Sequence, residues 1–194
     1  MSEFSLYFQL GMEHILDTQG YDHILFVIAL CAIYLISDWK KVLILVTAFT
    51  IGHSVTLALA TLKLIRFNSE LIEFLIPLTI LLTAISNLFR REHSIHSGRI
   101  QTNYMLAIVF GLIHGLGFSN FLRSILGQDR SIIVQLLAFN IGLEIGQIII
   151  VALFLVITLV LVDIFGVKRR DWKMIISSAV GGIALILMLE NKYW

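Results

Sequence analysis

Two stretches of more than twenty residues contain no aspartate, glutamate, lysine or arginine, and this feature restricts the fold more than any other. They cover residues 42–62 and 101–122. A helix that crosses the roughly 30 Å hydrocarbon core of a bilayer needs about 20 predominantly apolar residues, so each stretch is long enough. Charged residues make up only 14% of the chain, whereas they make up about 25% of a soluble domain. The sequence therefore predicts an all-α, polytopic membrane helix bundle with the lipid bilayer as a partner.

The hydropathy pattern predicts about six transmembrane helices in a single integral membrane domain that covers residues 1–194. Residues 1–20 mix apolar and polar side chains in the manner of an amphipathic helix that lies at the membrane interface. The fifth apolar stretch is about 48 Å long as a helix, which exceeds one perpendicular crossing. The sequence leaves open whether this stretch is one helix or is broken. The predicted spans are 21–37, 42–62, 69–89, 101–122, 134–162 and 172–189.

Basic residues indicate the orientation, because the cytoplasmic loops of membrane proteins carry an excess of lysine and arginine. The connections after the first, third and fifth spans hold nine such residues, and the opposite side holds five. We therefore expect a multi-pass protein of the bacterial inner (plasma) membrane with both termini outside. The nine residues are Lys40, Lys41, Arg90, Arg91, Arg99, Lys168, Arg169, Arg170 and Lys173, and the five are Lys63, Arg66, Arg123, Arg130 and Lys192.

The remaining composition excludes several kinds of partner. The net charge is +1, which gives no sign of nucleic-acid binding, and no phosphate-binding loop of the nucleotide-binding type is present. The single cysteine, Cys31, excludes zinc sites built from several cysteines. We expect no nucleic acid and no nucleotide as partners, and the sequence leaves homo-oligomer formation open.

Histidines and carboxylates inside the predicted spans are the candidate functional residues, because ionisable groups in a membrane are costly and usually face a cavity or a partner. Counting along the spans places all of them between the midplane and the outer surface. We expect Asp22 and His23, with His14, to capture a ligand at the outer face. A deeper site is expected from His53, His114 and Glu144, and supporting positions are Asp17, Glu73, Asn140 and Gln147.

The fifth span has two distinct faces. Asn140, Glu144 and Gln147 are spaced four and three apart, so they share one side of a helix. Gly142 and Gly146 have the spacing of a small-residue packing surface on the other side. We expect this span to pack through its glycines and to present polar groups on the opposite face.

Imidazole and carboxylate groups together suit a divalent first-row transition metal. Neutral imidazole supplies lone pairs, and carboxylates offset the charge of the ion in a medium of low dielectric constant. The set of side chains does not select among nickel, cobalt, zinc and iron. A divalent metal ion is therefore the expected ligand, with its identity open.

Five motifs of this chain resemble those of the HupE/UreJ family, membrane proteins associated with nickel hydrogenases and ureases. The resemblance implies a six- or seven-helix nickel or cobalt permease and implies functional roles for His14, Asp22, His23, His53, His114 and Glu144. Seven residues separate His14 from Asp22, whereas the nickel-permease signature has five, so the chain is similar to a second branch of the family. The motifs are residues 11–15 (GMEHI), 22–26 (DHILF), 49–57 (FTIGHSVTL), 110–118 (FGLIHGLGF) and 139–147 (FNIGLEIGQ).

Three functions remain open on these residues. The first is transport or binding of a divalent transition metal through an intramembrane histidine and carboxylate site. The second is an intramembrane metal-dependent hydrolase that acts on a lipid-like substrate, with a metal-bound water as the reactive group. The third is an accessory membrane subunit whose polar groups only hold the helices together. We favour the first, because no nucleophile motif supports an enzyme.

Overall fold

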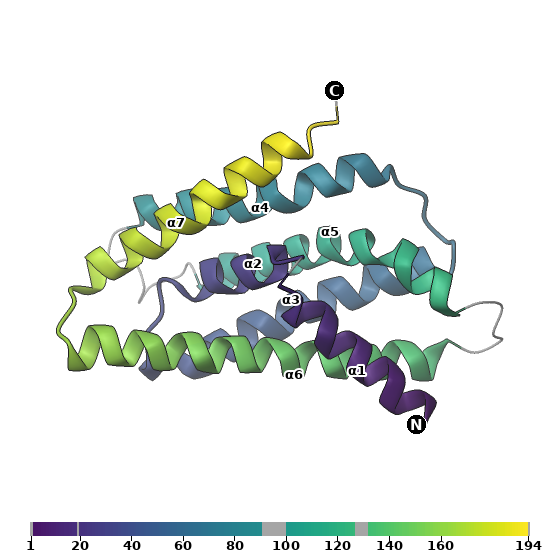
Figure 1. The fold of residues 1–194 in the computed structure, drawn as a ribbon, viewed down its shortest axis with the longest axis horizontal. Coiled ribbons are helices and arrows are strands. Elements are labelled where there is room, and N and C mark those ends of the chain that lie inside the picture. Colours follow the sequence, from purple (N-terminus) through teal and green to yellow (C-terminus); the bar gives the residue numbers. More distant parts are fainter. Residues whose placement is uncertain (1, 19, 91–99, 127–131, 194) are drawn as a thin grey trace.

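The computed structural model describes residues 2–18, 20–90, 100–126 and 132–193, and these residues form a helix bundle without β-strands (Figure 1). This confirms the all-α prediction. Three of the basic residues used to orient the chain, Arg91, Arg99 and Arg130, lie outside the described residues. The helices are α1 (Glu3–Leu16), α2 (Asp22–Cys31), α3 (Trp39–Thr61), α4 (Ser69–Phe89), α5 (Ile100–Leu126), α6 (Ile133–Thr158) and α7 (Arg169–Glu190). A short 3₁₀ turn, η1 (Ile36–Asp38), precedes α3, and a π-helical segment, η3 (Leu159–Ile164), follows α6.

Five segments of the described chain are long and apolar enough to cross a membrane. Helix α6 continues directly into η3, and together they form one helical segment of 32 residues, from Ile133 to Ile164. The fifth apolar stretch is therefore unbroken, and its extra length is accommodated by tilt or by extension beyond the hydrocarbon core. The five segments are Ile36–Thr61, Ser69–Phe89, Asn103–Ile125, Ile133–Ile164 and Arg169–Glu190.

Helices α1 and α2 are each too short to cross a bilayer. With 14 and 10 residues, they are about 21 Å and 15 Å long, against roughly 30 Å of hydrocarbon. Figure 1 shows α1 running from the N-terminus to the middle of the bundle and α2 continuing from there toward the opposite end. Together they have the length of one crossing, interrupted in the middle of the bundle, and His14 and His23 flank the interruption.

The first predicted span differs most from the structure, because residues 21–37 do not form one helix. α2 ends at Cys31, and side chains of other helices bind one carbonyl group in its last turn and one just after its end. Asn87 of α4 donates to the Ala29 carbonyl at 2.7 Å, and Arg169 of α7 donates to the Ile33 carbonyl at 2.8 Å. The free carbonyls at a helix end need such partners. Here the partners come from residues more than fifty positions further along the chain.

Helices α3 and α5 pack with their backbones almost in contact. A Cβ atom on Gly115 would overlap the carbonyl oxygen of His53, and one on Gly52 would overlap the carbonyl oxygen of Ile108. Small residues at such an interface let two helices approach closely. Because Gly115 follows His114 and Gly52 precedes His53, this contact fixes both histidines at the same level of the bundle.

Helix α1 packs against α6 through the glycine face predicted for the fifth span. A Cβ atom on Gly142 would overlap the carbonyl oxygen of Phe8, and one on Gly146 would overlap the Ile15 side chain. The buried residues of α1, including Gly11, lie on this contact. This packing directs the end of α1, with His14, into the interior of the bundle.

Candidate metal centre

The four membrane histidines converge on one point from four helices. His14 lies in the last turn of α1 and His23 in the first turn of α2, while His53 and His114 lie within α3 and α5. The ring centroids of His14 and His23 are 4.5 Å apart, and those of His23 and His114 are 5.2 Å apart. The ring of His53 lies 6.1 Å from both His14 and His23. We call these four residues the imidazole cluster.

Three members of the imidazole cluster lie close enough together to become ligands of one metal ion. His14, His23 and His53 each offer one ring nitrogen, and these nitrogens lie within 4.8 Å of one another. Two nitrogens bound to the same tetrahedral ion at about 2.0–2.1 Å lie roughly 3.4 Å apart. Small rotations of the side chains would therefore bring these nitrogens into one coordination sphere.

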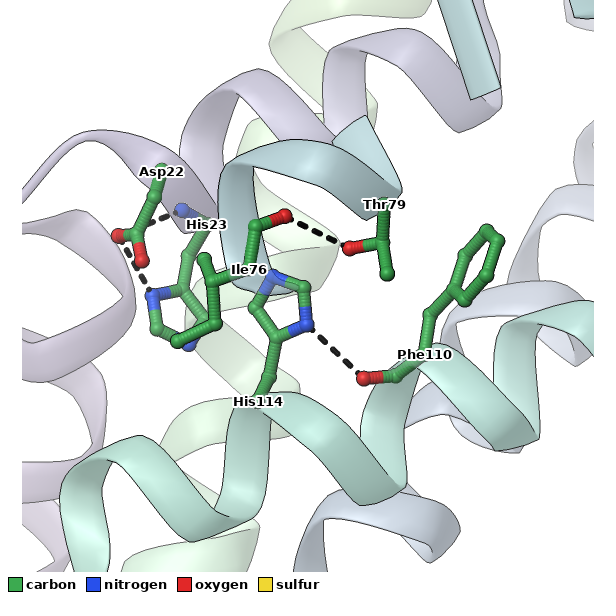
Figure 2. Close-up of polar contacts among 6 residues, drawn as sticks. All are labelled: Asp22, His23, Ile76, Thr79, Phe110 and His114. Atoms are coloured by element: carbon green, nitrogen blue, oxygen red, sulfur yellow. Dashed lines mark hydrogen bonds and ion pairs between the residues drawn. The ribbon is translucent and has the colours of Figure 1, made fainter. Parts of the chain in front are cut away.

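Hydrogen bonds at the outer side of two rings orient them. The Nδ1 atom of His23 lies 3.0 Å from the Asp22 carboxylate, and that of His114 lies 2.9 Å from the Phe110 carbonyl oxygen. Figure 2 shows the two rings beside each other, each linked through Nδ1 to an oxygen. A ring that donates its Nδ1 hydrogen to such an acceptor keeps the lone pair on Nε2, and this is the arrangement around most histidine ligands of metals.

The inner nitrogens of the imidazole cluster are buried and have no hydrogen-bond partner among the described residues. A buried polar atom left without a partner costs about 1–3 kcal/mol, and His53 and His114 are both 0% exposed. Because four residues with such atoms lie in one place, the free energy of folding carries a large unfavourable contribution unless a ligand binds these atoms. A divalent cation can bind one ring nitrogen from each of His14, His23 and His53, because a neutral imidazole ring offers one lone pair. The buried nitrogens without a described partner are His14 Nε2, His23 Nε2, His53 Nδ1 and Nε2, and His114 Nε2.

Aromatic side chains surround the imidazole cluster. The Phe118 ring lies 3.8 Å from that of His14, and the rings of Phe26 and Phe49 lie 5.1 and 5.2 Å from that of His114. An apolar shell limits the access of water and lowers the local dielectric constant. Charge on a bound ion is therefore felt strongly by nearby groups.

A cavity of about 810 Å³ opens next to the cluster and is lined by acidic side chains. His14, His23 and His114 form part of its wall, whereas His53 lies behind them. The described lining includes no lysine or arginine. The charged side chains of the described lining are therefore all acidic, and the cavity adjoins the imidazole cluster. Its acidic residues are Glu13, Asp17, Asp22 and Glu73.

The structure brings together five of the six predicted site residues. His14, Asp22, His23, His53 and His114 form one site instead of an outer and a deeper one. The two supporting carboxylates, Asp17 and Glu73, line the adjoining cavity.

The polar face of α6 lies elsewhere. Glu144 accepts a hydrogen bond from the Thr47 hydroxyl at 2.6 Å, and Gln147 accepts one from the Thr50 hydroxyl at 2.7 Å. Asn140 donates to the Leu136 carbonyl of its own helix at 2.8 Å. None of these three α6 residues lines the cavity. Glu144 therefore belongs to a contact between α3 and α6 and not to the imidazole cluster.

Sequence reasoning missed three polar residues that matter to this region. Thr47 and Thr50 are hydroxyl residues in a charge-free span at a spacing of three, which places them on one helix face and was a usable signal. Glu13 lines the cavity, and its position beside His14 gave the only hint of this.

Comparison with known proteins gives one match. No curated protein and no solved structure matches the chain. The family model described as HupE / UreJ protein matches residues 1–191, which is nearly the whole chain. The five motifs of the sequence and this match agree, and the chain belongs to the HupE/UreJ family.

Proposed function

We propose that this protein binds a divalent transition-metal ion in the imidazole cluster and transports it across the inner membrane. The observation that carries the proposal is the convergence of four buried histidines whose inner nitrogens have no partner among the described residues. Imidazole nitrogen is a ligand that suits nickel, cobalt, zinc and iron. Because the family is associated with nickel and cobalt transport, these two ions are the first probes.

The charge distribution supports a cation as the substrate. The four carboxylates of the cavity lie on α1, α2, α4 and the turn after α1, and they offset the charge of an entering ion. Asp22 stands both in the cavity wall and against His23. An ion can therefore exchange its water for imidazole nitrogen without losing the attraction of a carboxylate.

The asymmetry of the bundle supports transport. The cavity reaches the imidazole cluster on one side, and the rings of Phe26, Phe49 and Phe110 lie on the other side. The ring centroid of Phe26 is 4.9 Å from that of Phe49 and 5.7 Å from that of Phe110. We call these three residues the phenylalanine barrier. In the orientation expected from the basic residues, the cavity faces outward and the barrier separates the site from the cytoplasm. Access that alternates around a central site is the general mode of secondary transporters.

Metal content of the purified protein tests binding. We expect about one nickel or cobalt ion per chain in lipid nanodiscs, determined by elemental mass spectrometry, and loss of this ion in the double variant His53→Ala/His114→Ala. Ser177→Ala is the matched control, because Ser177 is also fully buried but lies on α7. Retention of the full metal content by the double variant would refute the site.

Uptake into proteoliposomes tests transport. Vesicles that contain the protein and a metal-sensitive dye should show nickel- or cobalt-dependent quenching, and vesicles with the double variant should behave as empty ones. A protein that binds the ion and never moves it would contradict transport while leaving the metal site intact.

A metal-dependent hydrolase is the second candidate, and one observation favours it. Three histidine nitrogens stand beside a cavity of about 810 Å³, which is large enough for part of a lipid. This function predicts a tightly held ion that survives washing with chelator, and hydrolysis of lipid-like amides or esters that ceases when the metal is removed. Rapid exchange of the bound ion would count against it.

A structural role is the remaining alternative. It predicts that His53→Ala/His114→Ala lowers the thermal stability and leaves metal content near zero in both proteins. Metal content therefore separates this role from the other two functions, and the rate at which the bound ion exchanges separates transport from hydrolysis.

A further inference from the structure

A second cavity, of about 250 Å³, lies among α2, α3, α4 and α5. No described residue lines both this cavity and the acidic one. Its described lining contains a single charged side chain, Arg90, and we therefore call it the Arg90 cavity. Most of the wall is apolar and is formed by Leu30, Ile33, Leu45, Leu82, Leu106 and Phe110.

The guanidinium group of Arg90 has no ion pair with a carboxylate among the described residues. Its Nη1 atom donates to the side-chain oxygen of Asn103 at 3.3 Å, and its Nε atom is buried without a partner in the described chain. A guanidinium group has several N–H donors and always carries its charge. Arg90 therefore brings unused donors and an unbalanced positive charge to the wall of an apolar cavity.

Two neutral polar side chains of the lining stand beside Arg90. Asn103, which accepts from Arg90, donates its own amide hydrogen to the Tyr34 hydroxyl oxygen at 3.1 Å. Tyr34 is only 2% exposed. In its one hydrogen bond within the described chain this hydroxyl group is the acceptor, so its hydrogen stays available to an anion.

Two further basic residues come from α7, which lies along α4 (Figure 1). Lys173 Nζ donates to the backbone carbonyl of Arg90 at 2.6 Å, and Arg169 donates to that of Ile33 at 2.8 Å. Both carbonyls belong to residues that line the Arg90 cavity, and the two basic residues share one face of α7 because they are four positions apart. Three positive charges therefore lie beside a cavity whose described lining contains no carboxylate.

The Arg90 cavity opens toward the lipid between α4 and α5. Leu82 of α4 and Leu106 of α5 both line it, and they are 49% and 43% exposed. Ser86, about one turn after Leu82, also lines the cavity and is exposed. All three residues belong to segments that are long and apolar enough to cross a membrane. A lipid chain can therefore enter the cavity sideways from the bilayer.

We propose that the Arg90 cavity binds one anionic phospholipid, with an acyl chain among its apolar residues and the phosphate group on Arg90 and Tyr34. Arginine and phosphate form strong, charge-assisted hydrogen bonds. In the orientation expected from the basic residues, the cavity faces the cytoplasmic leaflet, and basic pockets between helices on that side bind anionic head groups. The proposal does not depend on the imidazole cluster, because the two cavities share no described residue.

Native mass spectrometry of the full-length protein in detergent tests this proposal by titration with phosphatidylglycerol and with phosphatidylcholine of the same acyl chains. We expect wild type to bind phosphatidylglycerol more tightly by about tenfold or more, because each basic group near the head group contributes about fivefold. Arg90→Gln should lose about fivefold or more of this preference, and Arg90→Lys, which keeps the charge without the planar fork of donors, should keep part of it.

Arg170→Gln is the matched control for the charge. Arg170 is an exposed arginine on α7, next to Arg169, and it does not line the cavity, so this variant should keep the wild-type preference. An equal loss in Arg90→Gln and Arg170→Gln would indicate attraction to the whole basic surface and would overturn the proposal. The same preference in folded Arg90→Gln and wild type would also overturn it, because Arg90 would then serve only the end of α4 and the orientation of the chain.

Leu106→Trp tests the apolar part of the site and keeps every charge. The larger side chain fills the opening between α4 and α5, so we expect weaker binding of both lipids, and unchanged affinities would place the acyl chain outside this cavity. Glycerol phosphate carries the charge of the head group without an acyl chain, and it should not displace bound phosphatidylglycerol. Displacement at equal concentration would identify a soluble anion as the ligand and would contradict a lipid site.

Discussion

The Asp22 carboxylate holds His23 at two points. Its Oδ1 atom accepts a hydrogen bond from the backbone amide of His23 at 2.9 Å and lies 3.0 Å from the Nδ1 atom of the same residue. One acceptor thus binds a free backbone amide in the first turn of α2 and sets the direction of the imidazole ring. The aspartate–histidine pair is therefore a single unit in which the first residue of a helix orients a candidate metal ligand.

Replacement of Asp22 should weaken metal binding without abolishing it. We expect Asp22→Ala to lower the affinity for nickel or cobalt by about 10–100-fold, because loss of an outer-shell carboxylate has this typical effect. Asp22→Asn should lose less, since its side-chain oxygen can still accept from Nδ1. Competition with a chelating dye measures both affinities. Equal affinity in Asp22→Ala and wild type would show that the pair does not orient a ligand.

The contact between α3 and α5 should tolerate no side chain at Gly115. A Cβ atom there overlaps the backbone carbonyl of His53, and overpacking of this kind costs about 1–3 kcal/mol. We expect Gly115→Ala to lower the thermal unfolding temperature and to reduce metal content, because it displaces His53 and His114 together.

Gly182→Ala is the matched control for this prediction. Gly182 is also within a long apolar helix, and an added Cβ would meet nothing within 4 Å. The control should unfold at or slightly above the wild-type temperature. If both variants lost stability equally, the close approach of α3 and α5 would not explain the effect.

The sequence predicted the membrane helices well where local pattern determines them. The charge-free stretches became α3 and α5, and α4 begins and ends at the limits of the third predicted span, Ser69 and Phe89. The end of α2 could not be predicted, because Asn87 binds a carbonyl in its last turn and Arg169 binds one just after its end, both from distant parts of the chain. Such contacts leave no signal in the residues of α2 itself.

The site was predictable in composition and only partly in geometry. Counting residues along each helix gives the depth of a side chain in the membrane, and the four histidines counted to similar depths do lie together. Such counting does not tell which neighbouring helix a side chain contacts. Glu144 was therefore grouped with His53 and His114, although its face of α6 contacts Thr47. The break between α1 and α2, which places His14 beside His23, also arises from the packing of α1 on α6.

The affinity for the metal ion should fall as the pH falls. Imidazole binds a metal only in its neutral form, so protons compete with the ion and affinity falls as pH falls. We expect nickel or cobalt to raise the unfolding temperature most at neutral pH and progressively less as the solution is made more acidic, since a ligand stabilises only the state that it binds. Thermal scans with and without the ion, over the whole pH range in which the protein stays folded, measure this. Stabilisation that is the same at every pH in that range would exclude imidazole nitrogens as the main ligands.

The phenylalanine barrier should limit the rate of transport. Phe110 stands one turn from His114 on α5 and also lines a second cavity of about 250 Å³ on the far side of the barrier, next to Arg90 and Asn103. Phe110→Ala removes the ring between the two cavities but keeps the carbonyl that accepts from His114, because that group belongs to the backbone. We expect uptake into proteoliposomes to rise by about two- to tenfold while the affinity for the ion at equilibrium stays unchanged, as for a step limited by gating.

Phe118→Ala removes a ring on the cavity side of the cluster, so it should leave the barrier intact and serves as the matched control. A slower or unchanged rate in Phe110→Ala, with normal folding and metal content, would place the barrier elsewhere in the bundle.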